Sequence, residues 1–265
     1  TEGGYLMHKY RPDGSLGSSW HGWMVDGKPE LPIQEDETAL ILWALWEHWL
    51  VSKDLDFIES IYNSFIKKAA IFLTSYRDPY SGLPKPSYNL WEEKFGVHTY
   101  TAATVYAGLK AAARFAEMLG KERSEHNFDR VAEDMREAIV KHLYNIEDGS
   151  FYRSLIIDPR GMTIYDRTID SSSAYGIFLF GVLPPEDERL QKAMKLTKER
   201  LTIKTPVGGI ARYEGDKYFY SGGDQTGNPW FITTLWYTQY AIAMAKNDHD
   251  LDLVREELNW VEHNA

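Results

Sequence analysis

Two adjacent carboxylates, Glu92 and Glu93, stand directly after Trp91 in a segment that has just passed two prolines. Neighbouring side chains point in different directions from any regular helix or strand, so the two carboxyl groups cannot share one face. That pattern suits a site in which one carboxyl group transfers a proton while its neighbour binds the substrate. Two solvated acids in a surface loop would give the same local sequence, and only the rest of the chain separates these interpretations.

The bulk composition excludes several classes of function. The 39 acidic and 29 basic residues give a formal net charge of −10, which argues against a nucleic-acid surface or a polybasic membrane contact. The chain has no cysteine, so disulfides and thiolate metal sites are excluded. Its 9 Trp and 17 Tyr residues exceed what a plain core needs, and such rings often line sites for sugars.

No apolar run reaches the roughly 18 residues that a membrane helix needs. The chain begins at Thr1 without a visible signal peptide, so we expect a piece of a longer, cytoplasmic protein that contacts neither membrane nor nucleic acid. The histidine and acidic spacings typical of metal sites do not occur, and neither does a Gly-x-Ser-x-Gly nucleophile elbow. We therefore expect no metal and no cofactor.

Hydrophobic periodicity predicts helices in four consecutive pairs, joined by loops of alternating length. The predicted helices cover residues 36–52, 54–75, 101–119, 122–144, 171–183, 185–201, 229–246 and 251–262. The first is apolar almost all round, which predicts burial on most sides. Residues 149–157 alternate enough for a short strand or hairpin arm, and the long loops, including 77–98 and 202–228, carry the aromatic, glycine and acidic residues.

This order of elements suits an all-α (α/α)6 toroid, a six-hairpin barrel whose helix hairpins wrap a central core and whose long loops gather at one end. The chain would supply about eight of the twelve helices of such a barrel. No fixed-period sequence repeat is present, so an ankyrin-like array is not expected.

Four blocks of sequence, in order along nearly the whole chain, resemble glycoside hydrolase family 15, the glucoamylases and their bacterial and archaeal trehalase-like relatives. The blocks are residues 4–21, which include Tyr-Arg-Pro-Asp-Gly-Ser-Leu-Gly-Ser-Ser-Trp-His, residues 31–40, the Leu-Trp-Glu-Glu stretch at 90–93, and residues 208–213 with 227–232. The resemblance implies that Glu92 is the general acid and that Glu93 binds a sugar hydroxyl beside it. It also implies a set of pocket residues: Trp20, Trp91 and Trp230 as walls and Arg212 as a donor to substrate hydroxyls.

Three further residues are candidates on local grounds. His21 lies between Trp20 and Gly22, which makes it a better pocket candidate than the other histidines. Asp36 either binds substrate or caps the helix that follows it. His98 comes a few residues after the acids, and we expect it to fix the loop by hydrogen bonding rather than to titrate in catalysis.

The resemblance implies removal of glucose from the non-reducing ends of α-glucans with inversion. Such chemistry uses two carboxyl groups about 6.5–9.5 Å apart, with room for water between them. The acid must keep its proton near the working pH, which Trp91 as an apolar wall and Glu93 as a neighbouring charge would favour. A trehalase or glucodextranase of the same family, and a non-catalytic toroid that only binds glucan or another protein, remain alternatives.

The resemblance places the catalytic base in a Glu-Gln block beyond residues 259–263, and the sequence ends at Ala265. Glu257 and Glu262, on the last predicted helix, are expected to be solvated. We therefore expect residues 1–265 to be part of one (α/α)6 catalytic domain, without the N-terminal β-domain and the base-bearing segment of the family. Such a chain is expected to be incomplete for hydrolysis.

Overall fold

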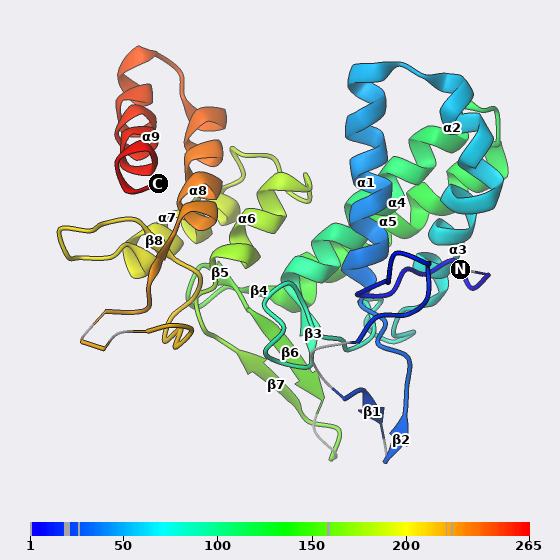
Figure 1. The fold of residues 1–265 in the computed structure, drawn as a ribbon, viewed down its shortest axis with the longest axis horizontal. Coiled ribbons are helices and arrows are strands. Elements are labelled where there is room, and N and C mark those ends of the chain that lie inside the picture. The colour runs from blue at the N-terminus through cyan, green and yellow to red at the C-terminus, as the bar shows by residue number, and fades with distance from the viewer. Residues whose placement is uncertain (1, 19–21, 26, 158–159, 221, 224) are drawn as a thin grey trace. The chain divides into compact units, whose positions relative to one another are not determined.

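The computed structural model describes residues 2–18, 22–25, 27–157, 160–220, 222–223 and 225–265. The chain divides into two compact units, residues 1–142 and 143–265 (Figure 1). Within these described residues no helix is both long enough and apolar enough to cross a membrane.

The first unit is built mainly of helices. Its elements are β1 (Met24–Val25), β2 (Lys28–Pro29), α1 (Glu35–Ser52), α2 (Leu55–Ile61), the π-helical turn η1 (Tyr62–Ile66), α3 (Lys67–Ser75), β3 (Val97–His98), α4 (Thr99–Met118) and α5 (Glu122–Leu143). β1 and β2 form a small antiparallel hairpin. Helix α1 packs along α4, and α3 contacts both (Figure 1).

Small residues allow α1 and α4 to approach closely. A Cβ atom at Gly108 of α4 would lie 2.9 Å from the carbonyl oxygen of Ala39 in α1, too close for any other residue without movement of the backbone. The alanine-rich sequence of α4 is buried along most of its length, which gives the first unit a densely packed centre. The close contact fixes the first turn of α1, which carries Glu35, Asp36 and Glu37, against α4.

The second unit combines short hairpins with helices. Its elements are β4 (Tyr144–Asn145), β5 (Ser150–Phe151), β6 (Ser154–Ile157), β7 (Thr163–Asp166), α6 (Ser171–Leu179), α7 (Glu188–Leu201), β8 (Ile210–Ala211), β9 (Pro229–Trp230), α8 (Phe231–Met244), the 3-10 turn η2 (Asp248–Leu251) and α9 (Asp252–Asn264). Antiparallel pairs join β4 to β5, β6 to β7 and β8 to β9. Helices α8 and α9 pack against each other as a hairpin (Figure 1).

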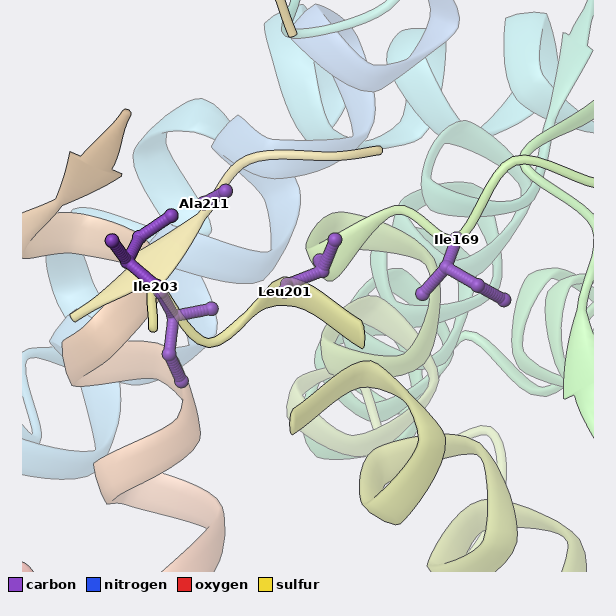
Figure 2. Close-up of a cluster of buried hydrophobic side chains, with 5 residues drawn as sticks. Ile169, Leu201, Ile203 and Ala211 are labelled. Carbon is purple, nitrogen blue, oxygen red and sulfur yellow. The ribbon is translucent and has the colours of Figure 1, made fainter. Parts of the chain in front are cut away.

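A buried apolar cluster anchors the loops of the second unit. It consists of Ile169, Leu201, Ile203, Ile210 and Ala211 (Figure 2). Leu196 of α7 and Tyr237 of α8 pack against it. The cluster therefore fixes the residues just before α6, the end of α7 and strand β8 relative to one another.

The predicted helices agree with the structure to within a few residues at each end. The stretch predicted as one helix over 54–75 contains the π-helical turn η1, where one extra residue per turn interrupts the regular hydrogen bonding. The strand or hairpin arm predicted at 149–157 is confirmed by β5 and β6.

One burial prediction is wrong. Helix α1 is not buried on most sides, because Ile41 and Leu50 are each 42% exposed and Val51 is 87% exposed. Among the described residues of the first unit, the main contacts of this helix are with α4 and α3. An apolar sequence all round the helix is therefore compatible with one open face.

Candidate functional site

The turn that carries Glu92 is closed by backbone pairing. Ser87 and Gly96 form an isolated antiparallel bridge, with N–H to O distances of 2.9 and 3.0 Å, and enclose the residues between them. Inside this loop the backbone N–H of Glu92 donates to the carbonyl of Asn89 at 2.8 Å. The backbone N–H of Trp91 donates to the Asn89 side chain at 3.2 Å. The buried Asn89 thus shapes the tip of the loop.

Glu92 adopts a left-handed backbone conformation, with a φ angle of 55°. Residues other than glycine seldom adopt this conformation, because it costs roughly 1–2 kcal/mol. Such strain gathers at functional sites, where surrounding contacts hold the residue in place. The strained position aims the Glu92 side chain at the start of α1, as its contacts below show.

Gln34 connects α1 to this loop. It is the N-cap residue of α1, but its side chain makes no capping hydrogen bond. Instead its side-chain N–H donates to Glu92 Oε1 at 2.5 Å, across 58 positions of sequence. Because Gln34 is buried, this bond is shielded from water and holds one oxygen of the Glu92 carboxyl group in place.

His8 is a site residue that the sequence did not reveal. Its Nδ1 lies 3.4 Å from Glu37 Oε1 and 3.5 Å from Glu92 Oε1. The N-terminal segment is held beside α1 by the Leu6 backbone N–H, which donates to Thr38 Oγ1 at 2.8 Å. No motif marks this histidine, because its partners come from two other segments.

Asp36 lies behind these groups and is buried. Its Oδ2 accepts a hydrogen bond from the Thr101 hydroxyl of α4 at 3.2 Å. Burial raises the pKa of Asp36 to about 8, the charges of Glu37 and Glu92 add to the rise, and the Thr101 bond offsets part of it. Asp36 is not the helix cap, since that position belongs to Gln34; its role as a substrate ligand stays a prediction.

The other two acids in the first turn of α1 also hold protons more tightly than usual. Burial raises the pKa of Glu35 to about 8, and the charge of Asp36 adds to the rise. Both oxygens of the Glu35 carboxyl group are buried without a hydrogen-bond partner among the described residues. Burial likewise raises the pKa of Glu37. The neighbouring His8 lowers this pKa, and the charge of Glu92 raises it further. The N-terminal end of the helix macrodipole makes this a favourable place for such a group of acids.

Taken together, the first unit holds a carboxyl cluster, defined here as Asp36, Glu37 and Glu92 with His8 and Gln34. The Glu92 side chain is 18% exposed and so retains limited access to solvent. A half-buried carboxyl group, with one oxygen fixed by an amide and other carboxyl groups close behind it, is suited to proton transfer.

The remaining predicted residues of the first unit lie partly outside this cluster. Trp91 is half-buried beside Glu92, and Glu93 is exposed, consistent with two carboxyl groups that face different directions. Trp20 and His21 lie outside the described residues. The predicted loop-fixing role of His98 is confirmed by the 3.0 Å hydrogen bond between its Nε2 and the Lys94 carbonyl oxygen.

Arg212, in the second unit, is held by two parallel hydrogen bonds to Asp216, each 2.8 Å long. Burial alone would raise the pKa of Asp216, but the bonds from Arg212 and from the Tyr218 backbone lower it. The guanidinium group also lies 4.9 Å from the ring centres of both Tyr218 and Trp230. Arg212 and Trp230, both predicted from sequence, therefore belong to one arginine–aromatic cluster.

Trp230 also borders a cavity of about 480 Å³ in the second unit. The cavity is lined by Val207, Asn228, Pro229, Trp230, Phe231, Trp260 and Asn264. The buried Nε1 of Trp230 has no hydrogen-bond partner among the residues that the structure describes. A ring with an unused donor is consistent with the predicted role as a pocket wall, which stays a prediction.

A second buried ion pair escaped the sequence reasoning. Arg153 Nε lies 3.1 Å from Asp170 Oδ2, and both side chains are almost completely buried. Asp170 is also the N-cap of α6, and the Arg153 guanidinium lies 4.1 Å from the centre of the Tyr213 ring. The aspartate before three serines is a helix-start signal that could have located Asp170.

The two acids of α9 behave differently from each other. Glu262 is exposed, as predicted. The prediction for Glu257 is wrong, because its side chain is only 13% exposed. It accepts a 2.6 Å hydrogen bond from Thr238 of α8 and lies 3.4 Å from Lys198 Nζ of α7. Glu257 therefore ties three helices together, which an amphipathic pattern alone does not disclose.

Replacement of Glu35 by glutamine tests the buried acid. The folded protein retains the Glu35 proton up to a pKa of about 8, whereas the unfolded chain loses it near the ordinary value of 4.5. The folded state therefore binds more protons between these values, and stability falls as the pH rises through them. We therefore expect the free energy of unfolding of Glu35→Gln to rise by about 4 kcal/mol relative to that of the parent between pH 4 and pH 8. Urea unfolding at pH 4 and pH 8 measures the free energy of unfolding of both proteins. An equal change with pH in parent and variant would contradict the expectation, and Glu262→Gln, at an exposed acid, is the control.

The left-handed backbone at position 92 yields a separate expectation. Both Glu92→Ala and Glu92→Gly remove the carboxyl group, but only glycine relieves the steric strain at positive φ. We expect the glycine variant to be about 1 kcal/mol more stable than the alanine variant. Urea unfolding of the two proteins compares them directly. A more stable alanine variant would show that the loop does not impose this conformation.

Comparisons with known proteins agree with one another. A family model described as glycosyl hydrolases family 15 matches residues 24–265. An uncharacterized glycosyl hydrolase of Methanocaldococcus jannaschii is 33% identical over an alignment of 255 residues, and the alignment covers 92% of this chain and 38% of the relative. The chain thus spans well under half the length of that curated relative.

Solved structures share the fold. A bacterial glucoamylase complexed with acarbose matches 87% of this chain and 36% of its own, with a TM-score of 0.63 and 22% identity. A wild-type glycosidase matches 100% of this chain and 60% of its own, with a TM-score of 0.71 and 21% identity. A glucoamylase from Saccharomycopsis fibuligera matches 88% of this chain and 50% of its own, with a TM-score of 0.62 and 19% identity. Because the family model matches residues 24–265, which are most of the chain, the chain belongs to glycosyl hydrolases family 15.

Proposed function

We propose that this chain carries the acid side of the active site of an inverting glycoside hydrolase that releases glucose from the non-reducing ends of α-glucans. Glu92 is the general acid of this proposal and Glu93 its neighbouring sugar ligand. Trp91, Trp20, His21 and Asp36 complete the substrate-binding residues of the first unit, and Arg212 and Trp230 those of the second.

The observation that carries the proposal is the way the Glu92 carboxyl group is held. Gln34 donates to Glu92 Oε1 at 2.5 Å, and the backbone at Glu92 is left-handed. A protein maintains a strained residue where the surrounding structure compensates for its cost. A general acid benefits from such rigidity, since proton transfer requires close and directed approach to the leaving oxygen.

In the proposed reaction the Glu92 carboxyl group donates its proton to the glycosidic oxygen as the bond from that oxygen to the sugar C1 breaks. A water molecule attacks C1 from the opposite face and gives its proton to a second carboxylate. The family resemblance places that base beyond residues 259–263. The products are glucose of inverted configuration and a glucan shortened by one unit.

An α-glucan is the proposed substrate because two of the solved structures with the same fold are glucoamylases, one of them complexed with acarbose. The half-buried rings of Trp91 and Trp230 suit the apolar faces of glucose units. We further propose that both units belong to one (α/α)6 toroid. Trehalose is the competing substrate within the family, and glucan binding without hydrolysis is the competing function.

Exchange of the proposed acid for an amide is the first test. Glu92→Gln keeps the size of the side chain and removes the proton that the leaving oxygen requires. In the full-length protein we expect glucose release from maltooligosaccharides to fall at least about 100-fold, the lower range of a general acid's contribution. Maltose binding by calorimetry should persist. Near-normal turnover would show that the acid is misassigned, and Glu262→Gln provides a control with an exposed acid.

A substrate panel tests the second part of the proposal. Maltose, starch, isomaltose and trehalose are assayed side by side with the full-length protein, and polarimetry follows the configuration of the released sugar. We expect the highest kcat/KM on α-1,4-linked substrates, with inversion. A clear preference for trehalose would favour the trehalase alternative. Binding of glucan with no hydrolysis of any substrate would favour the non-catalytic one.

A further inference from the structure

His8 lies between two carboxyl groups that come from separate parts of the first unit. Its Nδ1 is 3.4 Å from Oε1 of Glu37, in α1, and 3.5 Å from Oε1 of Glu92, in the loop closed by Ser87 and Gly96. The side chain of His8 is only 13% exposed. The same Glu92 oxygen also accepts the hydrogen bond from Gln34.

We propose that His8 is a positioning residue: with Gln34 it holds Oε1 of Glu92, and so assigns the proton of the acid to Oε2, which faces the leaving oxygen of the substrate. This inference rests on the proposed role of Glu92. A carboxyl group has two equivalent oxygens, and a general acid gains from a fixed choice between them. The Gln34 N–H donates to Oε1 and His8 Nδ1 lies 3.5 Å from the same oxygen; together they make that choice, because a protonated oxygen is itself a donor and cannot face an N–H group.

The tautomer of His8 follows from its neighbours. Both groups that face Nδ1 are carboxyl oxygens, and ionised oxygens only accept hydrogen bonds, so the ring proton belongs on Nδ1. Nε2 is buried and has no hydrogen-bond partner among the residues that the structure describes.

The charged groups that face His8 are Glu37 from α1 and Glu92 from the loop. Glu37 helps to hold the ring in place, since its Oε1 lies within hydrogen-bond distance of the same Nδ1 atom. Among the described residues, loss of the His8 ring would therefore leave Glu92 Oε1 held by Gln34 alone.

The test compares two replacements of His8 in the full-length protein. His8→Asn keeps an N–H donor near the position of Nδ1, and His8→Leu removes it. On a maltooligosaccharide, we expect His8→Leu to lower kcat about tenfold with little change in KM. His8→Asn should restore most of kcat, and His48→Leu, at an exposed histidine of α1, should change neither constant.

The outcomes separate this inference from the function on which it rests. An inactive Glu92→Gln variant beside a His8→Leu variant with unchanged kcat would overturn the positioning role alone. Equal losses in His8→Asn and His8→Leu would do the same, because the donor would then be irrelevant. Full activity of Glu92→Gln would overturn the proposed function and the positioning role together. If His8→Leu fails to fold by circular dichroism, His8→Phe supplies a ring of similar size without a donor.

Discussion

The hydrogen bond from Gln34 to Glu92 is the contact on which the arrangement of the site depends. It connects the first residue before α1 to the tip of a loop that precedes α4. The contact is possible because α1 packs closely against α4 at Gly108 and because Asn89 bends the loop back toward the helix. Helix packing, loop closure and a left-handed residue thus converge on one carboxyl group.

The acids at the start of α1 combine a structural and an electrostatic role. Their place in the first helical turn is favoured by the backbone dipole, while burial makes their ionisation costly. A chain selected for stability alone would replace such buried acids by apolar or amide side chains. Buried acids whose pKa values are raised in this way are typical of functional sites.

The sequence was sufficient for the helices and for much of the candidate site, for different reasons. Helices follow from local periodicity, and α4 and α5 appear where their apolar spacing puts them. Glu92 was predicted through the resemblance of the Leu-Trp-Glu-Glu stretch at 90–93 to a known family, and its role stays a proposal. His8 and Gln34 were not assigned roles, because their contacts join segments far apart in sequence. No local signal showed that Arg212 donates hydrogen bonds to Asp216. The same holds for Glu257 of α9, which contacts both α8 and α7.

The neutral acids of α1 also change how acidic the protein is. The formal net charge of −10 counts every aspartate and glutamate as ionised at pH 7. Glu35 and Asp36, each with a pKa of about 8, hold their protons at that pH. The net charge of the folded chain at pH 7 is therefore less negative, by nearly two units, than the formal charge counted from the composition. Its isoelectric point accordingly lies above the value that the composition gives. On an anion exchanger near neutral pH, the folded protein would elute ahead of an unfolded chain of the same sequence.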